Sequence, residues 1–398
     1  MIFAAPVAGA SGMLYMAGGA WVRIRSLDAV RGIAAVIVLL WHVSLTITAT
    51  AHQPSWLFAS PLRMLVAGPP AVILFFVLSG LVLAPSASLG REYLPYIISR
   101  CIRIWMPFAA SIVIAVILCG LLGQDPLRDA TGWFNYSWSD PVSSMLVLHH
   151  LLMTGAKDTL NNPAWSLFHE MRIAFILPFF VVGLRLRPME TCAASLILLI
   201  IASWAIHLTD RFIVRSILTS MQYVSLFVMG SLIAINANNV SAWIDARSPR
   251  LIAIAWLLGV GLLCFPPFQV GWISSPANLL WLLMQGVGAC IILSLCLSKA
   301  ATPSFLLGRT TSFLGQISYS LYLTHMLVLI SVVRLMDGHA PSWMGTLLSV
   351  SLVFPVAMAF HRLIERPSSM LARHLAKQAP IWFARSASWR LHPDARGR

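Results

Sequence analysis

Residues 25–43 read RSLDAVRGIAAVIVLLWHV, and this stretch decides the fold class. The apolar run after Arg31 has the length and composition of a membrane-spanning helix. Arg31 and His42 lie about three helical turns apart, so they share one face of that helix. Ionisable side chains inside a membrane are costly and often mark a substrate path or a reactive site. This helix alone leaves an alternative open, in which Arg31 reaches the membrane surface and His42 bonds a neighbouring helix.

The overall composition indicates the same class of protein. Of the 398 residues, 59% are hydrophobic and only 10% are charged, and the mean hydropathy is +0.82. A soluble fold of this length has too little core to bury so much apolar surface. We therefore predict an all-α integral membrane protein in contact with the lipid bilayer. The net charge of +14 fits cytoplasmic loops and a basic tail near anionic lipid, so nucleic-acid binding is not expected.

Apolar windows of about 20 residues, long enough to cross the hydrocarbon core, recur along the chain. They lie near residues 29–49, 65–84, 104–122, 165–184, 191–208, 217–236, 251–268, 277–298, 313–333 and 343–363. A bundle of about ten transmembrane helices places both ends of the chain on one side of the membrane. Most of the 27 Lys and Arg then fall in segments on that side. The positive-inside rule therefore predicts that both termini are cytoplasmic.

Three segments of the chain are expected to differ in character. Residues 1–22 form an N-terminal extension that lacks the early basic region of a signal peptide, and we predict loose structure there. Residues 23–368 form the transmembrane domain, and residues 369–398 form a basic cytoplasmic tail. The six cysteines lie in or beside apolar runs without a C-x-x-C pair, which indicates buried packing. His149 and His150 are adjacent instead of sharing a helical face, so no metal site is expected.

Two of the early spans carry features that suit a ligand or a close helix contact. The second span contains FFVLSG (75–80), in which the small residues Ser79 and Gly80 allow a helix or a ligand to approach the backbone. Arg100 and Arg103 lie one turn apart at the start of the third span. Their guanidinium groups suit bidentate binding of phosphate, although simple anchoring at the cytoplasmic surface explains the same pair.

The fourth span begins WSLFHE and places Ser166 and Glu170 on one helical face. We expect Glu170 near the outer surface at the depth of His42, where a carboxylate would orient the imidazole as a general base requires. A salt bridge between Glu170 and Arg172 or Arg63 at the rim of the membrane is the alternative.

The ninth span contains ISYSLYLTH, where Ser318, Tyr322 and His325 form a polar stripe. Such a stripe usually faces the interior of a bundle or a watery cavity. Near the end of the last span, Glu365 and Arg366 are expected to be surface anchors.

Together these motifs resemble the acyltransferase 3 family of integral membrane acyltransferases, in the expected order and over roughly residues 23–368. Each motif is short, but their order on a frame of ten spans is specific. The matching positions are Arg25, Asp28, Arg31-Gly32 and His42; FFVLSG (75–80); Arg100-x-x-Arg103 with Pro107; WSLFHE (165–170); ISYSLYLTH (317–325); and Glu365-x-Pro367.

The resemblance implies transfer of an acyl group, commonly acetyl, from cytoplasmic acyl-CoA to a hydroxyl of an extracytoplasmic glycan. Acceptors of that kind include lipopolysaccharide O-antigen and exopolysaccharide, and the location would be the bacterial cytoplasmic (inner) membrane. It implies His42 as the catalytic histidine and Arg100 with Arg103 as binders of the acyl-CoA phosphates. Arg31 and Glu170 match further positions of the site. Acyl-CoA would be a donor substrate, and no permanently bound cofactor is expected.

For such a reaction, we expect His42 either to take the hydroxyl proton or to accept the acyl group itself. Ser79 or Tyr322 would donate a hydrogen bond to the oxyanion, with Ser166 and His325 as further polar groups of the site. The rival from another class is a secondary transporter or flippase for a lipid-linked sugar or small solute. A new ester on the acceptor distinguishes the transferase from that rival.

Overall fold

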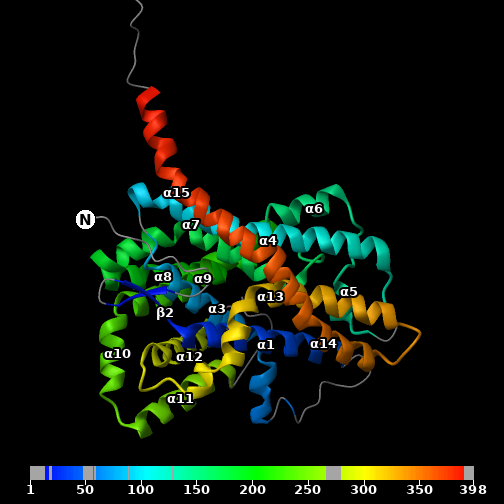
Figure 1. Ribbon diagram of the computed structural model, residues 1–398, viewed down its shortest axis with the longest axis horizontal. Helices are drawn as coiled ribbons and strands as arrows, with labels where there is room; N and C mark the ends of the chain where they lie inside the picture. Colours follow the sequence, from blue (N-terminus) through cyan, green and yellow to red (C-terminus); the bar gives the residue numbers. More distant parts are fainter. Residues whose placement is uncertain are drawn as a thin grey trace, which may run out of the picture.

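The computed structural model describes residues 14–17, 20–47, 57, 60–87, 89–127, 130–265 and 279–389. Over these ranges the protein is a bundle of helices with one small two-stranded sheet (Figure 1). The all-α class predicted from composition is therefore confirmed. Helices suit a bilayer because they satisfy their backbone hydrogen bonds within each segment.

Eight helical stretches of the described chain are long and apolar enough to cross a membrane. They are built on α1 (Arg25–Ile47), α4 (Tyr93–Leu122), α7 (Trp165–Leu186), α8 (Pro188–Ala205), α9 (Phe212–Ile235), α12 (Leu279–Leu297), α13 (Arg309–Met336) and α14 (Ser342–Phe360). The other two predicted spans correspond to the shorter apolar helices α3 (Gly68–Leu83) and α11 (Pro249–Cys264). Each predicted window thus overlaps a helix, although two of these helices are shorter than a full span.

The outward faces of these helices carry large apolar side chains. On α8 the exposed residues include Leu196, Ile197, Ile200 and Ile201. In water such a surface would be unfavourable, whereas lipid chains solvate it. The protein is therefore a multi-pass membrane protein.

Helix α13 is the most buried of the candidate spans and packs against α1 and α14. The backbones of α1 and α13 cross closely at Gly32 and Gly315. A Cβ atom added to Gly32 would lie 2.4 Å from the Gly315 nitrogen, and one added to Gly315 would lie 2.4 Å from the Asp28 oxygen. Only glycine fits such a contact. The crossing brings the polar face of α1 against the polar stripe of α13.

A second close contact joins α3 to α9 at Gly80. An added Cβ there would lie 2.1 Å from the carbonyl oxygen of Phe227. The hydroxyl of Ser231 donates to the Gly80 carbonyl at 3.2 Å. The prediction that the small pair Ser79–Gly80 permits close helix packing is confirmed.

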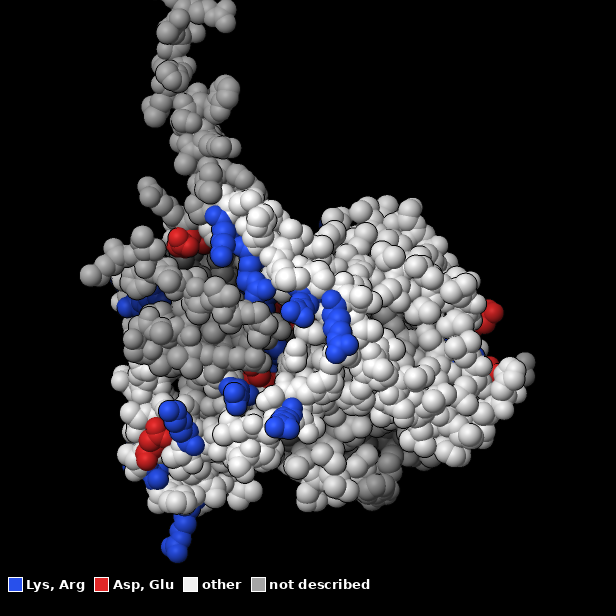
Figure 2. Space-filling model, viewed as in Figure 1, with Lys and Arg blue, Asp and Glu red and all other residues white. Residues whose placement is uncertain are grey.

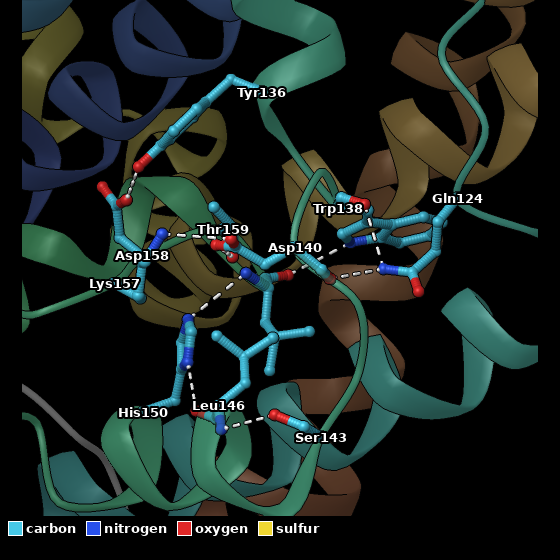
Figure 3. A network of polar contacts seen from close by, with 11 residues as sticks. Gln124, Tyr136, Trp138, Asp140, Ser143, Leu146, His150, Lys157, Asp158 and Thr159 are labelled. Carbon is cyan, nitrogen blue, oxygen red and sulfur yellow. Dashed lines mark hydrogen bonds and ion pairs between the residues drawn. The ribbon is translucent and has the colours of Figure 1, made fainter.

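The segment between α4 and α7 is ordered by short helices and polar contacts. It contains α5 (Gly132–Tyr136), α6 (Ser144–Leu151) and the 3₁₀ turn η3 (Asn162–Ala164). Figure 3 shows the network that joins the two ends of the segment. The main-chain amide of Trp138 donates to Thr159 at 2.9 Å, and the Gln124 amide donates to Trp138 and Asp140 at 3.0 and 2.8 Å.

Other short elements join the main helices. They are the 3₁₀ turns η1 (Pro61–Val66), η2 (Gly90–Glu92), η4 (Ile206–Leu208) and η6 (Ser304–Leu307), and the helix α10 (Ala237–Asp245).

Two terminal segments differ from expectation where they are described. Within the predicted loose extension, β1 (Leu14–Ala17) and β2 (Ala20–Arg23) pair antiparallel, while residues 1–13, 18 and 19 lie outside the described chain. At the other end, α14 continues through the π turn η7 (His361–Glu365) into α15 (Arg366–Trp389), which packs against α4. The expected boundary at residue 369 therefore falls within a helix. Residues 390–398 of the predicted tail lie outside the described chain.

Candidate active site

His42 on α1 and His325 on α13 form a direct pair inside the bundle. Their Nδ1 and Nε2 atoms lie 2.8 Å apart, the ring centroids are 4.9 Å apart, and both side chains are buried. The His325 Nδ1 atom lies 3.1 Å from the carbonyl oxygen of Leu321. A carbonyl only accepts, so His325 donates from Nδ1 and accepts at Nε2. His42 therefore donates from Nδ1 and keeps the lone pair on its own Nε2 atom.

The His42 ring is also stacked on Trp133 of α5. The two ring centroids are 5.0 Å apart and the planes differ by 16°. Helix α5 is tied to the end of α1, because the Thr131 hydroxyl donates to the Leu45 carbonyl at 3.1 Å. Sequence reasoning missed Trp133, since the only signal was the aromatic richness of the segment that contains it.

A cavity of about 480 Å³ is lined by α1, α3, η2, α4, α7, α13 and the η7–α15 region, and neither His42 nor His325 is among its lining residues. It brings together seven of the nine residues predicted for the site: Arg31, Ser79, Arg100, Arg103, Ser166, Glu170 and Tyr322. On α13 the lining extends to Tyr322, and His325 follows one turn later with its ring centroid 6.0 Å from that of Tyr322. On α13 the lining therefore stops about one turn before the histidine pair.

Glu170 does not orient His42, which corrects the expectation from sequence. Its Oε1 atom accepts from Arg100 at 2.7 Å and from the Ser79 hydroxyl at 3.3 Å. The alternative pairing with Arg172 is also wrong, because Arg172 donates to main-chain carbonyls at Met153 and Thr154.

The position of Glu170 follows from where its helix begins. The Tyr322 hydroxyl donates to the Pro163 carbonyl at 2.6 Å, so η3 already lies beside the middle of α13. Glu170 comes more than a helical turn after that point and is carried further toward Arg100. Hydropathy placed the start of α7 at the membrane surface, whereas this segment enters the bundle before its helix begins.

The hydroxyl groups predicted to face an oxyanion already have acceptors in the protein. Because Tyr322 donates to Pro163, the 2.7 Å contact between Ser166 and Tyr322 is a bond that Ser166 donates. Ser79 donates to Glu170, and Ser318 donates to the Gly315 carbonyl at 2.9 Å. These groups shape the cavity wall in the present arrangement.

Three arginines line the cavity, and each is held differently. Arg31 donates to the Gly315 carbonyl at 2.7 Å, and Arg100 is paired with Glu170. The Nε atoms of Arg31 and Arg100 are buried, and neither has a hydrogen-bond partner among the described residues. Arg103 is exposed toward the cavity and makes no ion pair with any described residue. The cavity thus offers guanidinium groups with unused donors.

Glu365 is also part of the cavity wall, so its expected role as a surface anchor is wrong. It is 6% exposed, and it accepts from the Ser320 hydroxyl and from His361 Nδ1, the latter at 2.9 Å. The π turn η7 directs it inward between two exposed arginines, Arg362 and Arg366. Turns of this type often occur at functional sites.

A family model describing an acyltransferase domain, that of the acyltransferase 3 family, matches residues 24–362. The chain belongs to the acyltransferase 3 family. The resemblance inferred from the separated motifs is therefore confirmed, and the protein is a membrane acyltransferase. Neither a curated protein nor a solved structure matched the chain.

The matched range of this acyltransferase contains every residue of the histidine pair and all cavity residues on α1, α3, α4, α7 and α13. Glu365 and Ser369 lie just beyond its end but still line the same cavity. The site of the acyltransferase is thus assembled mainly within the family domain and is closed on one side by α15.

Proposed function

We propose that this acyltransferase moves an acyl group, acetyl in the simplest case, from cytoplasmic acyl-CoA to a hydroxyl of an extracytoplasmic glycan in the bacterial inner membrane. O-antigen and exopolysaccharide are acceptors of the proposed kind. One observation carries the proposal: a cavity lined by three arginines reaches the turn before the His42–His325 pair. An acyl-CoA has the matching order of groups, with its phosphates at one end and its thioester at the end of a thin arm.

The donor would bind with its phosphates at Arg100 and Arg103. A guanidinium group can bind phosphate oxygens through two parallel hydrogen bonds. Arg103 has no ion pair among the described residues, and Arg100 retains an unused Nε donor. The cavity volume of about 480 Å³ is within the range of pockets that hold small ligands.

The reactive atom would be His42 Nε2, which keeps its lone pair because Nδ1 donates to His325. As a general base, Nε2 takes the proton of the acceptor hydroxyl while the oxygen bonds to the acyl carbon. The carbon–sulfur bond then breaks, and the proton passes from the imidazolium to the CoA thiolate. In the alternative route, Nε2 displaces the CoA thiolate from the acyl carbon; the acceptor hydroxyl then attacks that carbon, the N–acyl bond breaks, and the thiolate takes the hydroxyl proton. Both routes use the same lone pair.

The acceptor would approach from the side of Trp133. His42 stacks with both Trp133 and His325, and on α13 the cavity proposed for the donor ends one turn before His325. The two substrates would therefore reach the imidazole from different sides, as direct transfer requires.

Mass spectrometry of surface glycans tests the proposal in cells that carry the wild-type gene, a deletion, or the deletion with the gene restored. We expect a glycan with an added acyl mass in the first and third strains and its absence in the second. Ester hydrolysis in mild base should remove the added mass. If the deletion leaves the glycan mass unchanged but alters which side of the membrane the glycan occupies, the transporter or flippase function is supported instead.

A further inference from the structure

Basic side chains continue along α15 beyond the cavity. Figure 2 shows Lys and Arg in a row over this helix, leading from its outer part toward the body of the protein. The exposed members of the row are Arg362, Arg366, Arg373 and Lys377. Each is four or seven residues from another member, so all lie along one stripe of the helix.

One side of α15 is part of the cavity wall. Glu365 and Ser369 both line the cavity, and each is buried. Arg373 follows Ser369 by one helical turn and is exposed. Arg373 thus extends the group of cavity arginines outward along α15.

The cavity wall contains three carboxylates, Glu92, Glu170 and Glu365, together with the three arginines. Glu170 pairs with Arg100, and Glu365 pairs with His361. Among the residues that the structure describes, neither Arg103 nor Arg373 takes part in an ion pair. Two arginines that form no ion pair can each bind a separate charged group of an anionic ligand.

We propose that Arg373 binds the 3′-phosphate of the acyl-CoA donor, an inference that rests on the function proposed above. Acyl-CoA carries a diphosphate bridge and, on the neighbouring ribose, a separate phosphate monoester. Arg100 and Arg103 face the cavity and hold the diphosphate. Arg373 lies one turn outside the last α15 residue of the lining and holds the monoester at the mouth. The enzyme therefore distinguishes CoA from its 3′-dephospho form.

An anionic lipid headgroup is the other phosphate that a basic stripe beside a membrane can bind. Arg362 and Arg366 are exposed members of the stripe that line no part of the cavity. Arg373 also lies outside the lining, but it continues along α15 the four-residue spacing of Glu365 and Ser369, which do line the cavity. This position favours the donor as its ligand.

The test compares binding of CoA and 3′-dephospho-CoA to the purified full-length protein in neutral detergent, by calorimetry at one salt concentration. We expect the wild type to prefer CoA. Arg373→Ala should weaken CoA binding by roughly 10- to 100-fold, the range for a hydrogen bond between charged groups. The same variant should bind 3′-dephospho-CoA as the wild type does. Arg373→Lys keeps the charge but loses the paired donors of the guanidinium group, and it should retain part of the preference for CoA.

Arg247→Ala is the matched control, because it also removes one arginine charge. Arg247 lies over the ring of Trp243 at 4.1 Å, outside the cavity lining. It should leave the affinity for both ligands unchanged. A melting curve for each variant excludes a folding defect as the cause.

Several results would overturn the inference. A wild type that binds both ligands equally, or an Arg373→Ala variant that loses affinity for both to the same extent, rules out a 3′-phosphate contact while the donor class stands. If Arg373→Ala keeps the preference for CoA but binds phosphatidylglycerol vesicles less well, its ligand is lipid. If the wild type binds neither ligand, the proposed acyl-CoA donor itself fails.

Discussion

The Nδ1 atom of His42 lies 2.8 Å from the Nε2 atom of His325, although 283 positions separate the two residues in the chain. The carbonyl of Leu321 accepts the single ring proton of His325 from Nδ1, so Nε2 of His325 can only accept from His42. The lone pair of His42 is thereby held on Nε2, the atom that faces away from this bond. The reactivity of His42 consequently depends on a residue of another helix.

Replacing His325 with Leu should lower kcat for acyl transfer by about 100-fold or more, the lower range for loss of a working acid–base group. The KM for acyl-CoA should change by no more than about twofold, because His325 orients the base and does not hold the donor. His325→Asn retains a carbonyl that can accept from His42 and should recover part of kcat. Initial rates in isolated membranes at varied donor concentration measure both constants. A raised KM with unchanged kcat would assign His325 to donor binding.

Replacing Trp133 with Ala should lower kcat by roughly 2- to 10-fold, which corresponds to the usual contribution of a stacked aromatic pair. Trp133→Phe keeps a stacking face and should retain most of the activity. The same assay separates the two variants. Trp105→Ala is the matched control, because it removes an exposed indole from α4. Equal activity of Trp133→Ala and the wild type would show that the stack does not support His42.

Because Arg100 and Glu170 form an ion pair, we expect replacements of these two residues to have non-additive effects on the affinity for CoA. Arg100→Ala leaves the Glu170 carboxylate without its cation at the cavity, where it repels phosphate. The double variant Arg100→Ala/Glu170→Gln should therefore bind CoA more tightly than Arg100→Ala alone. We expect a coupling free energy of roughly 1 kcal/mol, since both groups are partly solvated. Calorimetry of the four proteins provides the value, and additive effects would show that the two side chains act independently.

Low pH should destabilise the segment between α4 and α7, because His150 becomes protonated (Figure 3). Burial lowers the pKa of His150, and its Nε2 atom accepts from the Leu160 amide at 3.3 Å. Asp140 and His149 are the charged or titratable side chains that act on it. The unfolded state binds more protons than the folded state below the ordinary histidine pKa of 6.5. The stabilisation is therefore complete above that pH and is lost as the pH falls through and below it.

Hydrogen exchange followed by mass spectrometry measures this effect on peptides that contain Leu160. After correction for the chemical exchange rate, protection should fall between about pH 8 and about pH 5.5, the range in which histidine titrates. His150→Gln keeps an acceptor that does not titrate, and its protection should vary less with pH. Equal protection of the wild type at both pH values would contradict the assignment.

Much of the fold could be predicted, because apolar runs mark membrane helices and small residues mark positions where helices pack closely. Every predicted apolar window overlaps a helix, and the glycine in FFVLSG occupies a close helix contact. The lengths of α3 and α11 could not be predicted, since an apolar window does not show where a helix ends.

The sequence predicted which residues form the site better than it predicted the contacts between them. Helical periodicity relates residues within one helix, so it identified His42 and His325 without indicating that they touch. Glu170 was placed too far outward because η3 enters the bundle as a polar, irregular segment that hydropathy does not recognise. Glu365 was expected at the surface because arginines flank it, whereas the π turn directs it inward.

The most direct measurement follows labelled acetyl from acetyl-CoA into surface glycan, using membranes that contain wild type, His42→Ala or His339→Ala at equal protein levels. His339 is an exposed histidine whose Nδ1 lies 3.0 Å from the Asp337 carbonyl, so its removal controls for loss of any histidine. We expect His339→Ala to transfer label as the wild type does, and His42→Ala to transfer no more than membranes from a deletion strain. Normal transfer by His42→Ala would contradict the proposal that acyl transfer takes place at this imidazole.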